Sequence, residues 1–131
     1  MEEKQPENKS ILLIDDDQFL RDMYSVKFRE RGFTVDSAES ALDALERLRA
    51  GLAPSIIVFD VVMPGLDGYD FLEKLASEKL AQGALKIALS NQGSDADIEK
   101  AKSLGAAEYI IKANTIPSEV VAKVLAVASS T

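Results

Sequence analysis

The chain has 131 residues and carries 22 acidic against 15 basic side chains, a formal net charge of −7. It contains no cysteine and no histidine, which excludes disulfides, zinc–thiolate sites and catalysis by Ser–His or Cys–His pairs. The acidic balance also argues against direct nucleic-acid binding or an anionic-membrane surface, both of which require clustered lysine and arginine.

The chain begins with a polar, charged segment that contains Pro6 and lacks the apolar core of a signal peptide. No later apolar run approaches the roughly 20 residues of a membrane span. We therefore expect a flexible tail over residues 1–8, one domain over residues 9–131 with no output domain, and a cytoplasmic location.

Short apolar runs then alternate with longer amphipathic stretches. In chain order, we predict a strand at Ile11–Ile14, a helix from Asp17 to Arg31, a strand at Phe33–Val35, a helix with Ala41, Leu42, Leu45 and Leu48 on one face, and a strand at Ile56–Phe59. The second half continues with a helix carrying Tyr69, Leu72, Leu75 and Ala76, a strand at Leu85–Leu89, a helix with Ile98, Ala101 and Leu104, a strand at Tyr109–Ile111, and a last helix from Pro117 with Val120, Val121, Val124, Leu125 and Ala128.

Strands that are apolar throughout are typical of parallel strands covered by helices on both faces. Right-handed crossovers between such strands produce an open, doubly wound sheet. The sequence therefore predicts an α/β fold of five βα units, arranged as a three-layer sandwich.

Polar and charged residues stand immediately after four of the five apolar runs. In an open parallel sheet, ligands bind at the carboxyl ends of the strands. The residues concerned are Asp15, Asp16 and Asp17 after the first run, Asp60 after the third, Ser90 after the fourth and Lys112 after the fifth. Each of them alone is an ordinary turn, cap or surface residue, but their shared position predicts one polar site at this edge of the sheet.

Carboxylates gathered at one edge repel each other unless a cation joins them, and Mg²⁺ (or Mn²⁺) suits a site of two or three carboxylates and several waters. Mg²⁺ also commonly binds phosphate oxygens, to which Ser90 and Lys112 could offer a hydrogen bond and a positive charge. An aspartate beside a metal is a known nucleophile for phosphorus. The set of residues therefore indicates phosphoryl transfer without histidine.

The segments ILLIDDD, FDVVMPGLDG, ALS and YIIK, in this order, resemble the receiver domains of two-component response regulators. The resemblance covers about residues 9 to 129, and its most specific element is the Asp-x-x-Met-Pro-x-x-Asp-Gly loop from Asp60 to Gly68. It implies a flavodoxin-like, five-stranded parallel sheet with strand order 2-1-3-4-5.

The resemblance also implies a role for each matching residue. Asp60 would be the phosphoacceptor, Ser90 the switch hydroxyl and Lys112 the lysine that pairs with the phosphoryl group. Tyr109 would be the switch aromatic, whose ring changes rotamer together with the hydroxyl. The Mg²⁺ ligands would be Asp15, Asp16, Asp60 and the backbone carbonyl of Val62. We interpret Asp17, which has no required family role, as the N-cap of the first helix.

Several positions depart from the usual family pattern. Ala113 follows Lys112 where the family commonly has a cis-proline. A cis bond before alanine costs about 2.5–4 kcal/mol, so we expect a trans bond with a rearranged loop or a strained cis bond. Asn91 stands after the expected switch hydroxyl, where the family usually has a smaller residue. Val62 and Gln92 occupy positions that flank the phosphoryl group in this family. Because an apolar Val62 orients an attacking water poorly, although Gln92 could do so, we expect a long-lived phosphoryl group.

Because the sequence contains no histidine, we expect the phosphohistidine donor to belong to another protein. The resemblance implies a histidine kinase or phosphotransfer protein that docks on the helix-one surface, where Phe19 is either a contact or a core residue. It further implies a downstream protein bound by the face formed from helix four, strand five and helix five.

Two other interpretations remain open at this point. One is an aspartate-nucleophile phosphohydrolase of the haloacid dehalogenase type, suggested by Asp-x-Asp in ILLIDDD and by ALSN. The order of the motifs and the short chain weigh against it. The other is a pseudo-receiver, a binding module without phosphorylation, for which Asn91 and Ala113 are the hints. We favour a signalling domain over an enzyme, with slow autodephosphorylation at most.

Overall fold

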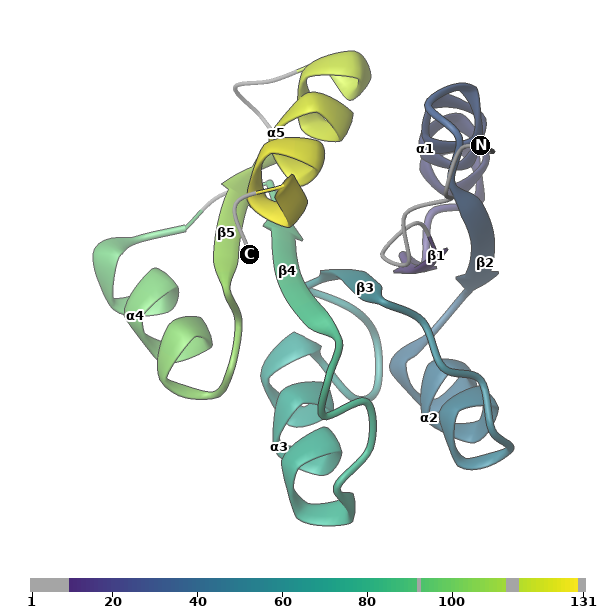
Figure 1. The fold of residues 1–131 in the computed structure, drawn as a ribbon. Helices are drawn as coiled ribbons and strands as arrows, with labels where there is room; N and C mark the ends of the chain where they lie inside the picture. Colours follow the sequence, from purple (N-terminus) through teal and green to yellow (C-terminus); the bar gives the residue numbers. More distant parts are fainter. Residues whose placement is uncertain (1–9, 92, 113–115, 130–131) are drawn as a thin grey trace.

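The computed structural model describes residues 10–91, 93–112 and 116–129 (Figure 1). The tail predicted at residues 1–8 lies outside this part of the chain. Within it, strands and helices alternate: β1 (Ser10–Ile14), α1 (Gln18–Glu30), β2 (Thr34–Ala38), α2 (Ala41–Arg49), β3 (Ile56–Asp60), α3 (Gly68–Glu78), β4 (Leu85–Ser90), α4 (Asp95–Ser103), β5 (Glu108–Ile111) and α5 (Pro117–Ser129).

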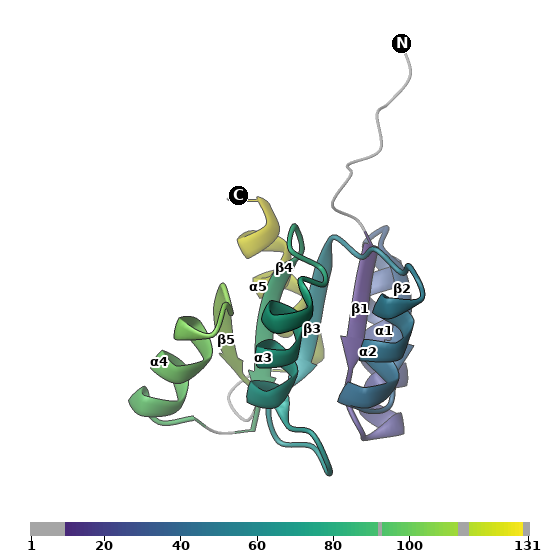
Figure 2. The same cartoon turned by 90° about the horizontal axis from the view of Figure 1, so that it is seen from below.

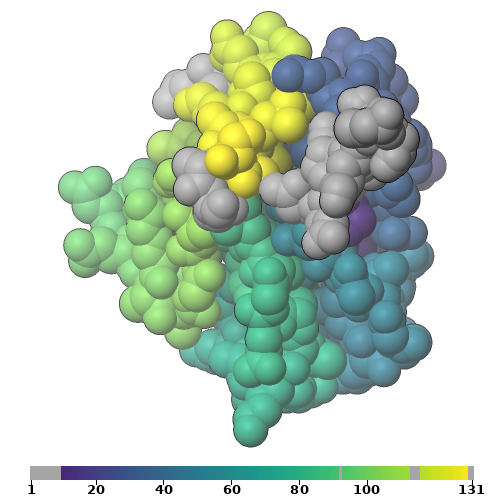
Figure 3. Space-filling view, in the orientation of Figure 1, coloured from purple at the N-terminus to yellow at the C-terminus, as the bar shows by residue number. Residues whose placement is uncertain are grey.

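The strands form one parallel sheet in the order β2-β1-β3-β4-β5, which confirms the predicted topology. Helices α2, α3 and α4 lie in front of the sheet in Figure 2, and α1 and α5 lie behind it. Figure 3 shows α5, in yellow, adjoining the blue surface of α1, in agreement with the contact between these helices. The molecule is therefore a three-layer α/β sandwich.

The central strands are buried on both faces because their successive side chains point into different helix layers. Leu12 and Ile14 of β1 belong to the core beneath α2, α3 and α4, while Ile11 and Leu13 belong to the core beneath α1 and α5. Every residue of β3 is buried. This double burial explains why the runs are apolar throughout and confirms that their pattern indicated parallel central strands.

Some element boundaries and core positions differ from the sequence prediction. β2 continues through Asp36 and Ser37, because an edge strand is half exposed and can carry polar residues. Leu42 is 52% exposed and Ala76 is also exposed, so neither belongs to the core. Ala44 takes the buried position on α2 instead. The errors at the two helices arise because the sequence pattern does not distinguish an apolar residue beside the buried stripe of a helix from one within that stripe.

The helix that follows β3 is fixed by its first residues. Asp67 is the N-cap of α3 and forms a reciprocal capping box with Asp70. The backbone amide of Gly68 donates a hydrogen bond to the carbonyl of Val61 (2.8 Å), which folds the loop after Asp60 back onto the strand.

Among the described residues, no helix is both long and apolar enough to cross a membrane.

Candidate functional site

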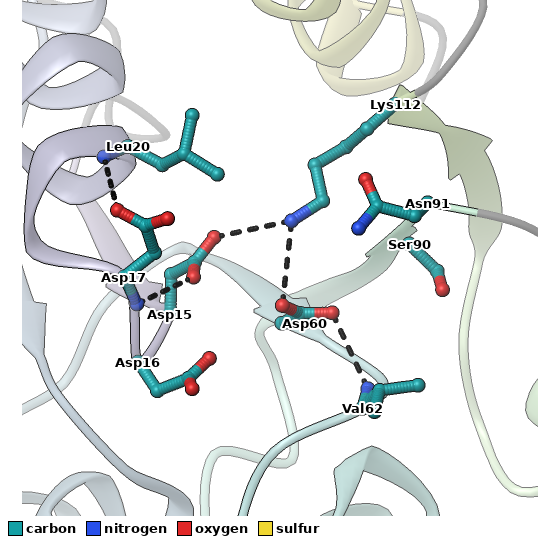
Figure 4. Close-up of a pocket in the computed structure, with 9 residues that line it drawn as sticks. All are labelled: Asp15, Asp16, Asp17, Leu20, Asp60, Val62, Ser90, Asn91 and Lys112. Atoms are coloured by element: carbon teal, nitrogen blue, oxygen red, sulfur yellow. Dashed lines mark hydrogen bonds and ion pairs between the residues drawn. The ribbon is translucent and has the colours of Figure 1, made fainter.

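A pocket of about 320 Å³ lies at the carboxyl edge of the sheet (Figure 4). The side chains around it come from the loop between β1 and α1, from the start of α1, and from the ends of β3 and β4 and the residues that follow β3, β4 and β5. They are Asp15, Asp16, Asp17, Leu20, Asp60, Val62, Ser90, Asn91 and Lys112. The structure thus brings together all six of the strand-end residues singled out in the sequence, although Asp60 and Ser90 end their strands rather than follow them.

Lys112 lies between two buried carboxylates. Its Nζ is 3.3 Å from Oδ2 of Asp60 and 3.4 Å from Oδ2 of Asp15, and Figure 4 shows it pointing toward both. The side chains of Lys112, Asp15 and Asp60 are only 6%, 2% and 10% exposed. Charges buried to this extent require partners, so the lysine offsets part of the negative charge of the pocket.

The pKa values of these groups shift in ways that follow from this arrangement. Burial raises the pKa of the Asp60 carboxyl, and the nearby Asp15 adds to the increase, although Lys112 and the backbone amide of Val62 oppose it. Burial lowers the pKa of Lys112, but Asp60 and Asp15 together outweigh it and the net pKa is raised. The surroundings of Asp60 therefore disfavour the ionised form of its carboxyl group, and a further cation would stabilise that form.

The loop between β1 and α1 holds Asp15 in place. The carboxylate of Asp15 accepts a hydrogen bond from the backbone amide of Asp17 (3.0 Å). Asp17 in turn accepts from the amide of Leu20 (3.1 Å), which confirms that Asp17 is the N-cap of α1. A single loop therefore fixes the acidic residues and starts the helix.

Arg21 is a residue of this site that the sequence interpretation missed. Its Nη1 donates a 2.8 Å hydrogen bond to the backbone carbonyl of Asp15. The available signal was its position four residues after the N-cap Asp17, because side chains in the first turns of a helix lean back toward its N-terminus. Arg21 therefore anchors the loop that presents the acidic residues.

The three acidic residues fit a small divalent cation. One carboxylate oxygen each from Asp15, Asp16 and Asp60 can be chosen so that all three lie within 4.8 Å of one another. Neighbouring and opposite ligands of an octahedral Mg²⁺ are about 3 to 4 Å apart, which matches this spacing. Asp16 is exposed while the other two are buried, so the group opens to solvent on the side from which a hydrated ion would enter.

Comparisons with known proteins agree with this geometry. The family model of the response regulator receiver domain matches residues 11–124. The chain belongs to this family. Chemotaxis protein CheY of Halobacterium salinarum is 30% identical to this chain, and the match covers 84% of this chain and 89% of CheY. The solved receiver domain of Francisella response regulator 1452 superposes with a TM-score of 0.81 at 26% identity, over 94% of this chain and 98% of that one.

Other relatives are considerably longer than this receiver domain. Transcriptional regulatory protein AfsQ1 of Streptomyces coelicolor is 31% identical over 79% of this chain, but the match covers 44% of AfsQ1. The chain therefore spans less than half the length of such relatives. Family membership confirms a signalling domain of two-component systems and favours this interpretation over the haloacid-dehalogenase alternative.

The remaining predicted residues surround the receiver pocket at different depths. Ser90 is 2% exposed and lines the pocket, whereas Asn91 lines it from an exposed position. Tyr109 is buried in the core under α2, α3 and α4 and does not line the pocket. Gln92 and Ala113 lie outside the described residues, and so does the predicted choice between cis and trans at the Lys112–Ala113 bond.

Proposed function

We propose that Asp60 accepts a phosphoryl group from a phosphohistidine of a partner histidine kinase or phosphotransfer protein. The observation that carries this proposal is the position of Asp60 at the end of the central strand β3, 3.3 Å from Lys112 and grouped with Asp15 and Asp16. A carboxylate that lines a pocket among such groups is suited to phosphoryl transfer, which depends on positioning and charge neutralisation.

In the proposed reaction, a carboxylate oxygen of Asp60 attacks the phosphorus and forms a P–O bond. The P–N bond to the donor imidazole breaks, and its electron pair and the proton that it takes up stay with the partner protein. Lys112 neutralises charge on the phosphoryl oxygens, and Ser90 donates a hydrogen bond to them. The chain has no histidine, so it stands on the accepting side of the transfer.

Receiver domains of this family typically bind Mg²⁺ at an acidic pocket. We assign its ligands here as Asp15, Asp16, Asp60 and the carbonyl of Val62, with Mn²⁺ as a substitute. When bound, the ion supplies a positive charge that lowers the repulsion between the carboxylates and the incoming phosphoryl group. The raised pKa of Asp60 supports this assignment, because burial makes the ionised carboxylate unfavourable and a bound cation would offset that cost.

Receiver domains interact with kinases and with effector domains. We assign kinase docking to the surface of α1, where Phe19 is 71% exposed and therefore not a core residue. Output would pass through the face of α4, β5 and α5 as Ser90 and Tyr109 move toward the phosphorylated state. We further propose that this signalling takes place in the cytoplasm.

Treatment with acetyl phosphate and Mg²⁺ tests this function. Intact-mass measurement should show one added phosphate on the wild type and none on Asp60→Asn. Asp67→Asn is a matched control, because it removes an acid from the same loop outside the pocket, and it should still be labelled. No addition to the wild type would favour the pseudo-receiver, and sustained hydrolysis of a generic phosphatase substrate would favour an enzyme.

The phosphorylated form should be long-lived, with a half-life of minutes or more. The apolar side chain of Val62 is 71% exposed at the mouth of the pocket, where it has no group that could orient an attacking water. Replacing Val62 by glutamine should shorten the half-life several-fold, as measured by the decay of the phosphorylated mass. A wild-type half-life of seconds would contradict this expectation.

A further inference from the structure

Gly93 lies directly against the ring of Tyr109. Tyr109 pairs with Ala88 across β4 and β5, and its side chain extends into the buried core beneath α2, α3 and α4. A Cβ atom added to Gly93 would lie 2.7 Å from Cε1, 2.8 Å from the hydroxyl oxygen and 2.9 Å from Cζ of Tyr109. Real Cβ atoms essentially never approach other atoms this closely, so the present ring position requires glycine at residue 93.

The backbone gives no other reason for this glycine. The φ angle of Gly93 lies outside the left-handed region, unlike those of Gly51, Gly65 and Gly105. The three atoms that a Cβ would meet most closely all belong to the far end of the tyrosine side chain. At Gly68, in contrast, the two closest atoms are backbone atoms of Val61 and Asp60. The missing side chain at Gly93 therefore accommodates the ring rather than a turn.

We propose that Gly93 is the positioning residue that keeps the ring of Tyr109 buried against the segment joining β4 to α4. Any side chain at residue 93 drives the ring outward, because rotation about χ1 moves the ring to another staggered position at lower cost than a shift of the backbone. The ring and the segment then exclude each other sterically, and one position of the segment corresponds to one position of the ring.

The consequence for signalling rests on the proposed function. Ser90 ends β4 three residues before Gly93, so a movement of Ser90 toward a phosphoryl group moves the segment that contains Gly93. The space beside Gly93 opens or closes with that movement, and Tyr109 follows it. Gly93 thus connects the pocket to the β5 surface through a steric contact.

Nitration of tyrosine by tetranitromethane tests the positioning of the ring directly, because nitration occurs at the Cε carbons and Cε1 is the atom closest to Gly93. The chain has three tyrosines, and each can be followed by peptide mass mapping without any phosphodonor. In Gly93→Ala, nitration of Tyr109 should increase several-fold over the wild type. Tyr24, which is 3% exposed, is an internal reference that should not change.

Gly83→Ala is the matched control, because Gly83 also has a φ outside the left-handed region, but a Cβ added there would have no atom of the described residues within 4 Å. It should leave the nitration of Tyr109 unchanged. A second measurement applies if Gly93→Ala disturbs folding. The loss of thermal stability that Gly93→Ala causes in the wild type should disappear when the same substitution is made in Tyr109→Ala. Unchanged nitration of Tyr109 in Gly93→Ala, or an equal cost with Ala at 109, would overturn the proposal. Because neither measurement uses phosphorylation, failure of Asp60 to be labelled remains a separate result.

Discussion

Replacing Gly68 by alanine should lower the free energy of unfolding by about 2 kcal/mol, as expected for overpacking of a filled site. An added Cβ would lie 2.8 Å from Cα of Val61, 3.0 Å from the carbonyl oxygen of Asp60 and 3.1 Å from a ring carbon of Phe59. Two of these atoms are backbone, so the end of β3 must shift. The better helix propensity of alanine, worth about 1 kcal/mol, offsets only part of this cost.

The same shift moves Asp60, so labelling of Gly68→Ala by acetyl phosphate should also slow down. Urea denaturation monitored by circular dichroism measures the loss of stability. Gly83→Ala is the control, because its added methyl group would meet no atom of the described part of the chain within 4 Å. Equal stability of the two alanine variants would show that the close approach of Gly68 to β3 does not constrain the site.

Replacing Asp60 by asparagine should instead raise the free energy of unfolding by about 0.5–2 kcal/mol in metal-free buffer at neutral pH. Residues kept for function often reduce the stability of the fold, so replacing them can stabilise it. Burial and Asp15 raise the pKa of the Asp60 carboxyl in the folded state, despite Lys112. An acid with a raised folded pKa contributes stability that is present below its unfolded pKa and lost as the pH rises through the folded pKa. The difference in free energy of unfolding between Asp60→Asn and the wild type should therefore shrink as the pH is lowered into the acidic range.

Replacing Lys112 by methionine should have the opposite effect and lower stability by about 3 kcal/mol in EDTA, because it leaves two buried carboxylates without their shared cation. Mg²⁺ should then stabilise Lys112→Met and the wild type more than Asp60→Asn, since binding to the folded state raises stability by mass action. Thermal melts with and without Mg²⁺ measure both effects. Shifts of the same sign for Asp60→Asn and Lys112→Met would contradict this account of the charges.

Much of the fold and the composition of the pocket could be predicted from the sequence, because both follow from simple periodicity. Runs that are apolar at every position, such as Ile56–Phe59, are buried on both faces and indicate parallel central strands. Parallel strands align their carboxyl ends, so residues that terminate different runs, such as Asp60 and Lys112, meet in one pocket.

The rest depends on contacts between residues that are distant in sequence. That Lys112 bridges Asp15 and Asp60 is set by three strand ends and not by any local pattern. The contact between Gly93 and Tyr109 requires the register of β4 against β5, which periodicity does not supply. Polar residues of the edge strand β2 were missed for a related reason, because exposure at the sheet edge weakens the apolar signal.

The side chain that carries the phosphoryl group can be identified directly. The domain is labelled with acetyl phosphate and Mg²⁺ and then reduced with borohydride, which converts an aspartyl phosphate to homoserine. Peptide sequencing by mass spectrometry should find homoserine at position 60 and leave Asp15 and Asp16 unmodified. Homoserine at Asp15, Asp16 or any other acid, with Asp60 unmodified, would contradict the assignment of Asp60 as the phosphoacceptor.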